Sequence, residues 1–547
     1  MSARPARSLG SMFLGLILIT TGCAGAVTPA ADRTSATTQP ESTPAGETTT
    51  EAPASSSAVL AGTHADAADD QWDESSEVAI SLVDGRTAGA AGVSVEGDVV
   101  TITAGGTYRL SGSLSDGQVV VDTADEETVR LVLDGVTIAN STTSPVSVVD
   151  AEKVVVILAA GSRNALTDAT DYQYPSADAS EPNAALFSTS DLTITGDGSL
   201  TVSGQYNDAI ASKDGLIIAG GTIVVTAADD GIRGKDYLVV TGGTLTVTAG
   251  GDGLKADNVE DVLLGYVAIS GGTLDLTAGT DAIDATTNLV VDEGSMTISA
   301  GDDALHADVR LEINGGTIDI DRSYEGLEAT QVVITGGDTD VVAEDDGLNV
   351  AGGNDASAAN GPGDRVRPGG PGGGMGGEVA VDGYYVEISG GTLVIDAGGD
   401  GFDSNGSAAI TGGTVVVNGP TSNGNGAIDV NGEFAMSGGV LLAAGSAGMA
   451  ETPGASSAQA YLDLQFNSGQ AAGTVVTIRS TDGSSIATFV ASKPFQSLVF
   501  SAPDLVPGAS YEVLTGGSVT GDGLGGLNLG VDSTGGASLG SVTAVAG

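Results

Sequence analysis

Apolar and polar residues alternate along short segments through most of this chain. Segments such as "IVVTA" (223–227) and "LTVTA" (245–249) place every second side chain on one face, as in a half-buried β-strand. A helix would need about a dozen residues with a period near 3.6, and the repeats have neither. The turn "GGT" precedes these segments at Gly220, Gly242, Gly271, Gly315, Gly390 and Gly412. The pattern therefore predicts an all-β protein of many short strands.

The "GGT" turns recur at a regular interval. Gly220 and Gly242 lie 22 residues apart, and degenerate copies at 197–199, 293–295 and 336–338 continue the series. Two or three strands per repeat cannot bury an apolar face alone, so neighbouring repeats must stack. The predicted fold is a right-handed, single-stranded parallel β-helix. It has one turn per repeat, with rungs about 4.8 Å apart.

The composition divides the chain into four regions. Residues 1–23 read as a signal peptide, and 24–68 are a tether rich in Thr, Ser, Pro and Ala that cannot form a core. The β-helix is assigned to 69–450, with a Gly-rich loop inserted at 352–382. Segments such as "TVVTIRS" and "SSIATFVAS" in 451–547 predict a β-rich cap of antiparallel strands that protects the open end of the solenoid.

The N-terminal segment resembles a bacterial lipoprotein signal. Arg4 and Arg7 precede a short apolar stretch that ends in "TTGC", and Cys23 is the chain's single cysteine. Thr20 stands where such signals usually have leucine, and an ordinary signal peptide cut near "AGA" is the alternative. We expect an extracellular protein held to the membrane only through a lipid on Cys23.

The net charge of the chain limits the classes of molecule that it can bind. It has 71 acidic and 18 basic residues, for a formal net charge of −53. Nucleic acids and anionic membrane surfaces would repel such a protein, whereas cations would be attracted to it. A soluble monomer is expected.

The repeat places an acidic residue at the same corner of each turn. Stacked carboxylates about 5 Å apart repel one another unless a cation neutralises them. Calcium suits such corners because it binds six to eight oxygen ligands in irregular geometry. The candidate calcium ligands are Asp208, Asp229, Asp230, Asp252, Asp281, Asp284, Asp302, Asp303, Asp345, Asp346, Asp400 and Asp403. The alternative is that Asp simply suits tight turns, because its side chain bonds to the backbone.

Basic and aromatic residues near these corners are candidates for sugar binding. The candidates are Lys213, Arg233, Lys235, Lys255, Tyr206 and Tyr237. The cations could instead neutralise the carboxylates, and the tyrosines could simply pack between rungs. The two histidines, His64 and His306, are too few and too far apart in sequence to suggest a zinc site. No catalytic residue is assigned.

Longer phrases resemble a known family. They include "TYRLSGSLSDGQVVVD" (107–122), "VRLVLDGVTI" (129–138), "DDGIRGKD" (229–236) and "GPGGGMGG" (370–377). The chain resembles bacterial carbohydrate-binding domain-containing proteins, a pectate-lyase-like β-helix family whose clostridial representative binds cellulose and polygalacturonate. This resemblance implies bound calcium and binding of acidic sugars or glucan without established catalysis.

The resulting expectation is calcium-supported, non-catalytic polysaccharide binding at the bacterial cell surface. A calcium-dependent polysaccharide lyase is the first alternative, because an arginine or lysine could remove the proton next to the sugar carboxylate. An adhesin or a structural envelope protein is the second.

Overall fold

A computed structural model describes residues 62–176, 178–351 and 380–546. The predicted signal peptide, Cys23, residues 24–61 of the tether and residues 352–379 of the inserted loop lie outside the described residues. Within the described ranges, no helix is long and apolar enough to cross a membrane.

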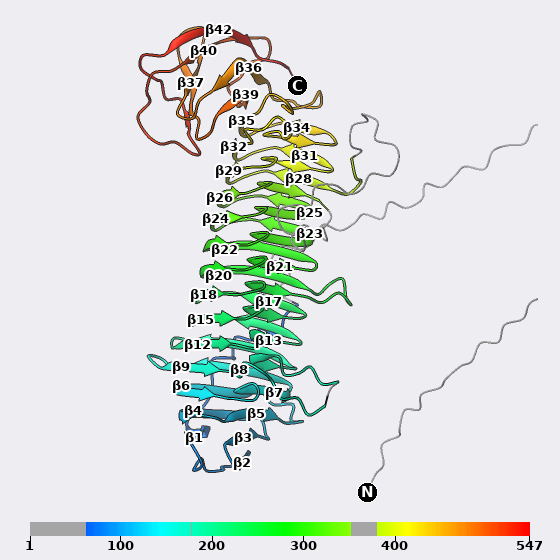
Figure 1. Ribbon diagram of the computed structural model, residues 1–547, viewed down its shortest axis with the longest axis vertical. Coiled ribbons are helices and arrows are strands. Elements are labelled where there is room, and N and C mark those ends of the chain that lie inside the picture. The colour runs from blue at the N-terminus through cyan, green and yellow to red at the C-terminus, as the bar shows by residue number, and fades with distance from the viewer. Residues whose placement is uncertain (1–61, 177, 352–379, 547) are drawn as a thin grey trace, which may run out of the picture. The chain divides into compact units, whose positions relative to one another are not determined.

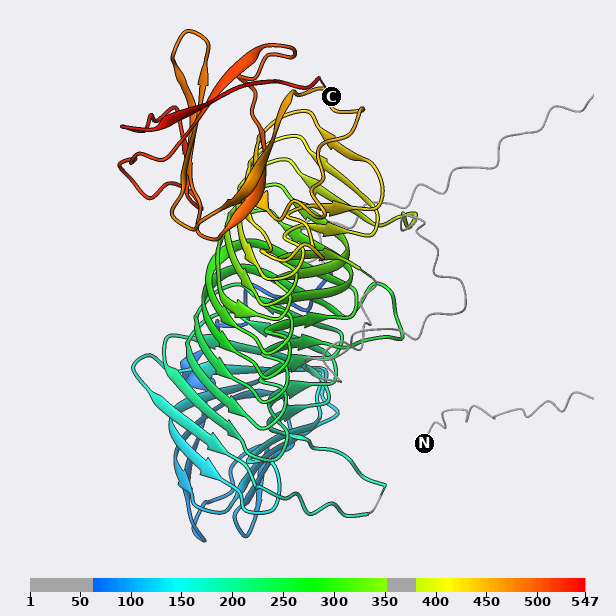
Figure 2. The ribbon, with the colours of Figure 1, turned by 45° about the horizontal axis from the view of Figure 1, so that its top comes forward.

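The strands stack as parallel rungs (Figure 1). Ile210 pairs with Ile232 and Thr222 with Thr244, each 22 residues further along the chain. Seen from a second direction, successive turns coil around one common interior (Figure 2). The predicted parallel β-helix is thus confirmed, and its strands form three faces that we name the corner, middle and GGT sheets.

The corner sheet contains the strands that follow the acidic turns, together with their N-terminal continuation. These strands are β3 (Val99–Ile102), β5 (Gln118–Asp122), β7 (Val146–Asp150), β10 (Ala184–Ser188), β13 (Asp208–Ser212), β16 (Ile232–Gly234), β19 (Leu254–Ala256), β21 (Ile283–Ala285), β23 (Leu305–Ile313), β25 (Leu327–Ile334), β27 (Leu348–Val350), β30 (Asp403–Ser404) and β33 (Asp429–Val430). A short strand, β2 (Val93–Glu96), pairs antiparallel with β3.

The middle sheet starts at the first rung, and several of its longer strands continue into a neighbouring sheet. Its strands are β1 (Val78–Val83), β4 (Gly106–Leu114), β6 (Val129–Ala139), β8 (Lys153–Leu158), β11 (Asp191–Gly196), β14 (Gly215–Ile218), β17 (Tyr237–Val240), β20 (Tyr266–Thr277), β22 (Asn288–Ser299), the second halves of β23 and β25, β28 (Tyr385–Ile388), β31 (Ser407–Ile410) and β34 (Phe434–Met436).

The GGT sheet contains the strands that follow the glycine turns. They are the second halves of β4 and β6, β9 (Arg163–Thr167), β12 (Ser199–Gly204), β15 (Thr222–Ala227), β18 (Thr244–Thr248), the second halves of β20 and β22, β24 (Thr317–Ser323), β26 (Asp338–Ala343), β29 (Thr392–Ala397), β32 (Thr414–Asn418) and β35 (Val440–Gly445).

Glycine is required at the second position of the "GGT" turn. Gly243 has a φ of +95°, a conformation that side-chain-bearing residues rarely adopt. A Cβ there would also lie 2.9 Å from the carbonyl oxygen of Gly221 in the preceding rung. The turn can therefore stack on its neighbours only without a side chain.

Apolar residues of all three sheets fill the interior. In the corner sheet, Ile232, Leu254 and Ile283 stack in successive rungs, and each is 0% exposed. Burying a side chain of this size contributes about 1.5–3 kcal/mol. Because each apolar position contacts its copies in neighbouring rungs, the core is continuous.

The C-terminal region ends the parallel stacking. β36 (Tyr461–Gln470) and β35 both pair antiparallel with β39 (Phe495–Ser501). A five-stranded sheet follows in the order β41 (Leu527–Leu529), β38 (Ser485–Val490), β37 (Val475–Ser480), β40 (Ser510–Thr515) and β42 (Ala537–Thr543). The antiparallel pairing covers the last GGT strand, whose free edge could otherwise pair with another chain.

Residues 62–68, assigned to the tether, instead pack on the middle sheet. His64 Nε2 lies 2.9 Å from the Thr193 hydroxyl, and the backbone N–H of His64 donates to the Tyr237 hydroxyl. The 3-10 helix η1 (Glu74–Ser76) follows just before β1. The sequence did not predict that residues 62–68 pack on the β-helix, because polar contacts to residues more than 100 positions away hold them there.

Candidate cation and carbohydrate site

One position of the corner sheet brings together charged and polar side chains from eight rungs, and we name it the ion column. The backbone register pairs its members one after another. They are Arg233, Lys255, Asp284, His306, Glu328, Asn349, Asp403 and Asp429.

Acidic residues just before these strands stack beside the ion column. We name them the corner acids, and they include Asp230, Asp252, Asp281 and Asp303. Asp230 Oδ1 accepts a bond of 3.0 Å from the backbone N–H of Asp252, whose Oδ1 accepts one of 3.1 Å from Asp281. Asp281 Oδ1 in turn accepts a hydrogen bond of 2.9 Å from the backbone N–H of Asp303. These bonds favour aspartate at the corners whether or not metal binds. This agrees with the alternative that aspartate suits tight turns because its side chain bonds to the backbone. They engage one oxygen of each carboxylate.

Two of the predicted sugar-binding cations lie within the carboxylate ladder. Arg233 forms ion pairs of 3.0 Å with both Asp208 and Asp257. Lys255 contacts Asp252 and lies 3.0 Å from Asp284. Both side chains therefore neutralise carboxylates of the chain itself.

Lys213 and Lys235 lie nearer to solvent. Lys213 pairs with Glu181 at 2.6 Å, and Lys235 pairs with Glu260 at 3.1 Å. Both pairs are exposed enough for solvent to compete with them, so their contribution to stability is small.

The two predicted tyrosines differ in exposure. Tyr206 is 37% exposed, and its ring stacks on Tyr172 with centroids 4.5 Å apart. Tyr237 is only 6% exposed, stacks on Tyr266, and contacts His64 through its hydroxyl group. The arrangement leaves Tyr206 as the more accessible ring.

Burial makes several corner acids hard to ionise. Burial raises the pKa of Asp208 to about 7, although Arg233 opposes the shift. Burial also raises the pKa of Asp230 to about 6, against the attraction of Lys255. Asp346 reaches a pKa of about 8 through burial and the neighbouring charges of Asp345 and Asp400. Added positive charge at the corners would stabilise the ionised carboxylates.

A surface hollow of about 570 Å³ opens over the rungs between Asp229 and Asp308. Its lining includes Asp229, Asp230, Asp252, Lys255, Asp281, Asp284, Asp302, His306 and Asp308. The hollow thus collects six of the predicted calcium ligands and one of the predicted sugar-binding cations.

The oxygen atoms of Asp281, Asp302 and Asp303 fit a hard cation. One carboxylate oxygen of each lies within 4.8 Å of the others. Calcium accepts such all-oxygen sets and completes its shell with carbonyl groups and water. Among the described residues, every such group of three lies around the rungs of Asp281 and Asp303. The other proposed ligands form none: Asp208, Asp229, Asp230, Asp252, Asp345, Asp346, Asp400 and Asp403.

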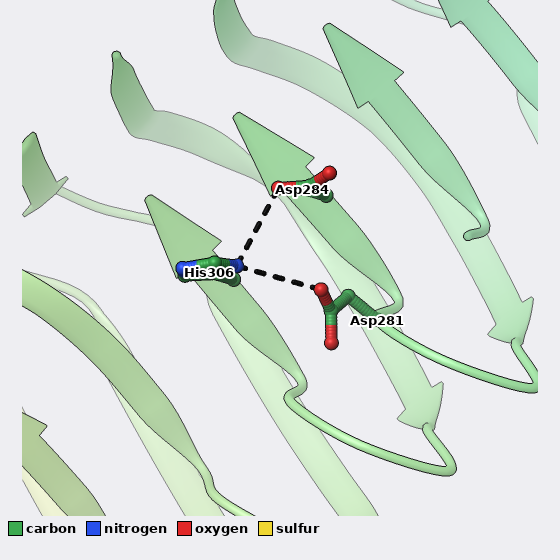
Figure 3. Close-up of side chains that lie close together, drawn as sticks. All are labelled: Asp281, Asp284 and His306. Carbon is green, nitrogen blue, oxygen red and sulfur yellow. Dashed lines mark ion pairs between the residues drawn. The ribbon is translucent and has the colours of Figure 1, made fainter. Parts of the chain in front are cut away.

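The sequence interpretation missed His306 as a member of this site. Its Nδ1 atom lies 3.4 Å from a carboxylate oxygen of both Asp281 and Asp284 (Figure 3). Burial opposes a charged imidazole, but the bond to Asp281 and the charge of Glu328 raise the pKa of His306 to about 9. The available signal was its place in the ion column, between two acids.

Part of this chain is similar to known proteins. Residues 96–347 match the family model of carbohydrate-binding domain-containing proteins, which confirms the resemblance over that part of the chain. A carbohydrate-binding domain-containing protein of Acetivibrio thermocellus is 43% identical over 136 residues. The match covers 25% of this chain and 48% of the relative, about half of its length.

A solved structure is also similar. It is described as the polysaccharide lyase-like protein from C. thermocellum, gadolinium derivative. It is 38% identical, with a TM-score of 0.37, and the match covers 44% of this chain and 92% of that chain.

Proposed function

We propose that this protein binds polysaccharide non-catalytically, with calcium at its corner acids helping to hold an acidic sugar chain such as polygalacturonate. The observation that carries the proposal is the open hollow lined by stacked carboxylates, within the segment that matches the carbohydrate-binding family. A chain of net charge −53 repels a polyanion. A calcium ion bound by Asp281, Asp302 and Asp303 would bridge the two negative partners.

The ion pairs of Arg233 and Lys255 favour binding over lyase chemistry at these two residues. A lyase needs an arginine or lysine that can take a proton from the sugar. Arg233 and Lys255 each contact two carboxylates, which hold the cation in its charged form. Burial disfavours the charged ammonium group, but the neighbouring charges of Asp284 and Asp252 outweigh it and raise the pKa of Lys255. A protonated lysine is a poor general base.

The test is a pull-down on polygalacturonate and on cellulose, with calcium and then with a chelator, while the absorbance of unsaturated uronate is followed. We expect retention on polygalacturonate that the chelator abolishes, without a rise in absorbance. A rise in absorbance would identify a lyase. Retention that survives the chelator would refute the role of calcium, and no retention on either polymer would refute the binding of both.

A matched pair of variants locates the calcium. Asp302→Asn removes one ligand of the all-oxygen corner, whereas Asp275→Asn makes the same charge change on an exposed position of the GGT sheet. We expect only Asp302→Asn to weaken retention. Equal effects of the two variants would indicate a general charge effect instead.

We further propose that Cys23 carries a lipid that anchors the protein outside the cell membrane. The signal-like sequence before Cys23 supports this. Metabolic labelling with a fatty acid should mark the wild type and not Cys23→Ser. Labelling of both would refute the anchor.

A further inference from the structure

We propose that Asp303, His306 and Glu328 form a binding site for a divalent transition-metal ion, which adjoins the calcium corner and shares Asp303 with it. Each offers one ligand atom, and the three atoms lie within 4.8 Å of one another. They come from the corner before β23, from β23 itself and from β25, so the stacking of neighbouring rungs brings them together.

The site contains buried polar atoms without hydrogen-bond partners. The Glu328 side chain is 3% exposed, and its Oε1 atom is buried without a hydrogen bond. His306 Nε2 is also buried without one. Such atoms are rare in folded proteins because desolvation without a partner costs free energy. A metal ion between the two would satisfy both.

The other face of the imidazole is arranged as in metal sites. Nδ1 lies 3.4 Å from oxygens of Asp281 and Asp284, toward which its N–H group can donate (Figure 3). That tautomer directs the lone pair of Nε2 away from these acids. Metal-bound histidines usually donate their second N–H to a carboxylate in this way, which orients the ring.

The distances around Nε2 are close to those of a coordination sphere. Oxygens of Asp308 and Glu328 lie 3.7 Å and 3.9 Å from Nε2. Metal–ligand bonds of about 2.0–2.2 Å need ligand atoms roughly 3–3.5 Å apart, so Glu328 Oε2 and the Asp308 oxygen would have to approach Nε2 by a few tenths of an ångström. The Asp303 oxygen lies within 4.8 Å of the other two ligand atoms and would have to move further. His306 and Asp308 line the surface hollow, which provides a path for the ion.

The mixed ligand set decides the class of metal. One imidazole nitrogen with two or three carboxylates suits zinc, cobalt or manganese, whereas calcium prefers oxygen ligands alone. The competing arrangement is a protonated His306 that neutralises the same acids without metal. Binding of metal would displace that proton.

The test titrates the untagged, mature protein with cobalt(II) in the presence of saturating calcium, and follows the visible absorbance of the bound ion. His306→Gln removes the nitrogen ligand. The matched control is His64→Gln, because His64 is the only other histidine of the chain. We expect one saturable site in the wild type and in His64→Gln, and affinity weaker by about tenfold or more in His306→Gln.

A second variant keeps the test decisive if His306→Gln does not fold. Glu328→Gln should weaken cobalt binding and leave calcium binding unchanged. The proposal is overturned if cobalt does not bind saturably, if calcium alone displaces it completely, or if both His306→Gln and Glu328→Gln bind it like the wild type. In those cases His306 is a structural cation.

Discussion

Arg233 shows how single side chains offset the charge of this protein. Its guanidinium joins Asp208, which is 1% exposed, to Asp257. Burying a carboxylate is unfavourable unless a cation and hydrogen bonds compensate it. The residue that sequence reasoning placed among the sugar ligands therefore has a clear role inside the fold.

Arg233→Ala should destabilise the protein by about 3–5 kcal/mol, because it leaves the buried Asp208 without a compensating cation. The measurement is the midpoint of denaturant unfolding. Lys213→Ala is the control, since its pair with Glu181 is 37% and 42% exposed, and about 0–1 kcal/mol is expected. Equal losses in both variants would contradict this account.

Glu77 provides a pH-sensitive contact next to the single tryptophan. Its carboxylate accepts bonds of 2.7 Å and 2.8 Å from Arg109, and a bond of 2.6 Å from Trp72 Nε1. The bond to Arg109 holds the pKa of Glu77 below its usual 4.5, although burial opposes this shift. The contact therefore stabilises the fold above pH 4.5, and this stabilisation is lost as the pH falls through the lower, folded-state pKa.

We expect Trp72 fluorescence to change as the pH is lowered below 4.5 and Glu77 takes up a proton. Glu77→Gln should show the low-pH emission already at neutral pH. An identical titration in both proteins would assign the change to another group.

At the scale of the element, the repeat depends on its glycine turn as much as on its apolar strands. Gly243 and its equivalents, such as Gly221, Gly272 and Gly316, all have positive φ. At Gly243, Gly272 and Gly316 a Cβ would lie 2.9–3.2 Å from a backbone oxygen of the rung before, so each of these turns fixes the register of the next strand. This is why the "GGT" phrase alone located the rungs correctly.

Gly243→Ala should lower the stability by about 1–2 kcal/mol or more, since it forces a left-handed conformation on alanine and adds a close contact. Gly424→Ala is the control, because a Cβ at Gly424 meets nothing within 4 Å. Denaturant midpoints compare the two. A loss confined to the control would refute the explanation.

At the scale of the whole molecule, the stacking of rungs gathers like charges. The formal net charge is −53, and the corner acids Asp230, Asp252, Asp281 and Asp303 follow one another from rung to rung. Self-repulsion of this kind destabilises a compact state and is relieved by screening or by bound cations.

In the presence of a chelator, raising sodium chloride from about 0.01 M to about 1 M should raise the melting temperature, because the Debye length shrinks from roughly 30 Å to about 3 Å. Without the chelator, calcium added at constant ionic strength should raise the melting temperature further. The measurement is thermal unfolding by circular dichroism. If magnesium and calcium act equally, or neither adds to the salt effect, specific calcium sites are refuted.

The sequence by itself determined the architecture, because a period of 22 residues with alternating apolar positions allows few packings other than stacked rungs. It also placed Asp281, Asp284, Asp302 and Asp303 near one another, since equal positions in a repeat share a column. It could not determine which carboxylates converge. That depends on insertions such as the one after Lys255 and on side-chain direction.

Only the tertiary structure decided that Arg233 and Lys255 form ion pairs with carboxylates and that Tyr237 is buried, with its hydroxyl in contact with His64. The same holds for His306, which lies between acids from neighbouring rungs. These contacts join residues tens to more than a hundred positions apart. The local sequence pattern does not encode these contacts. They depend on the strand register and on the path of the non-repeating segments, which only the complete fold fixes.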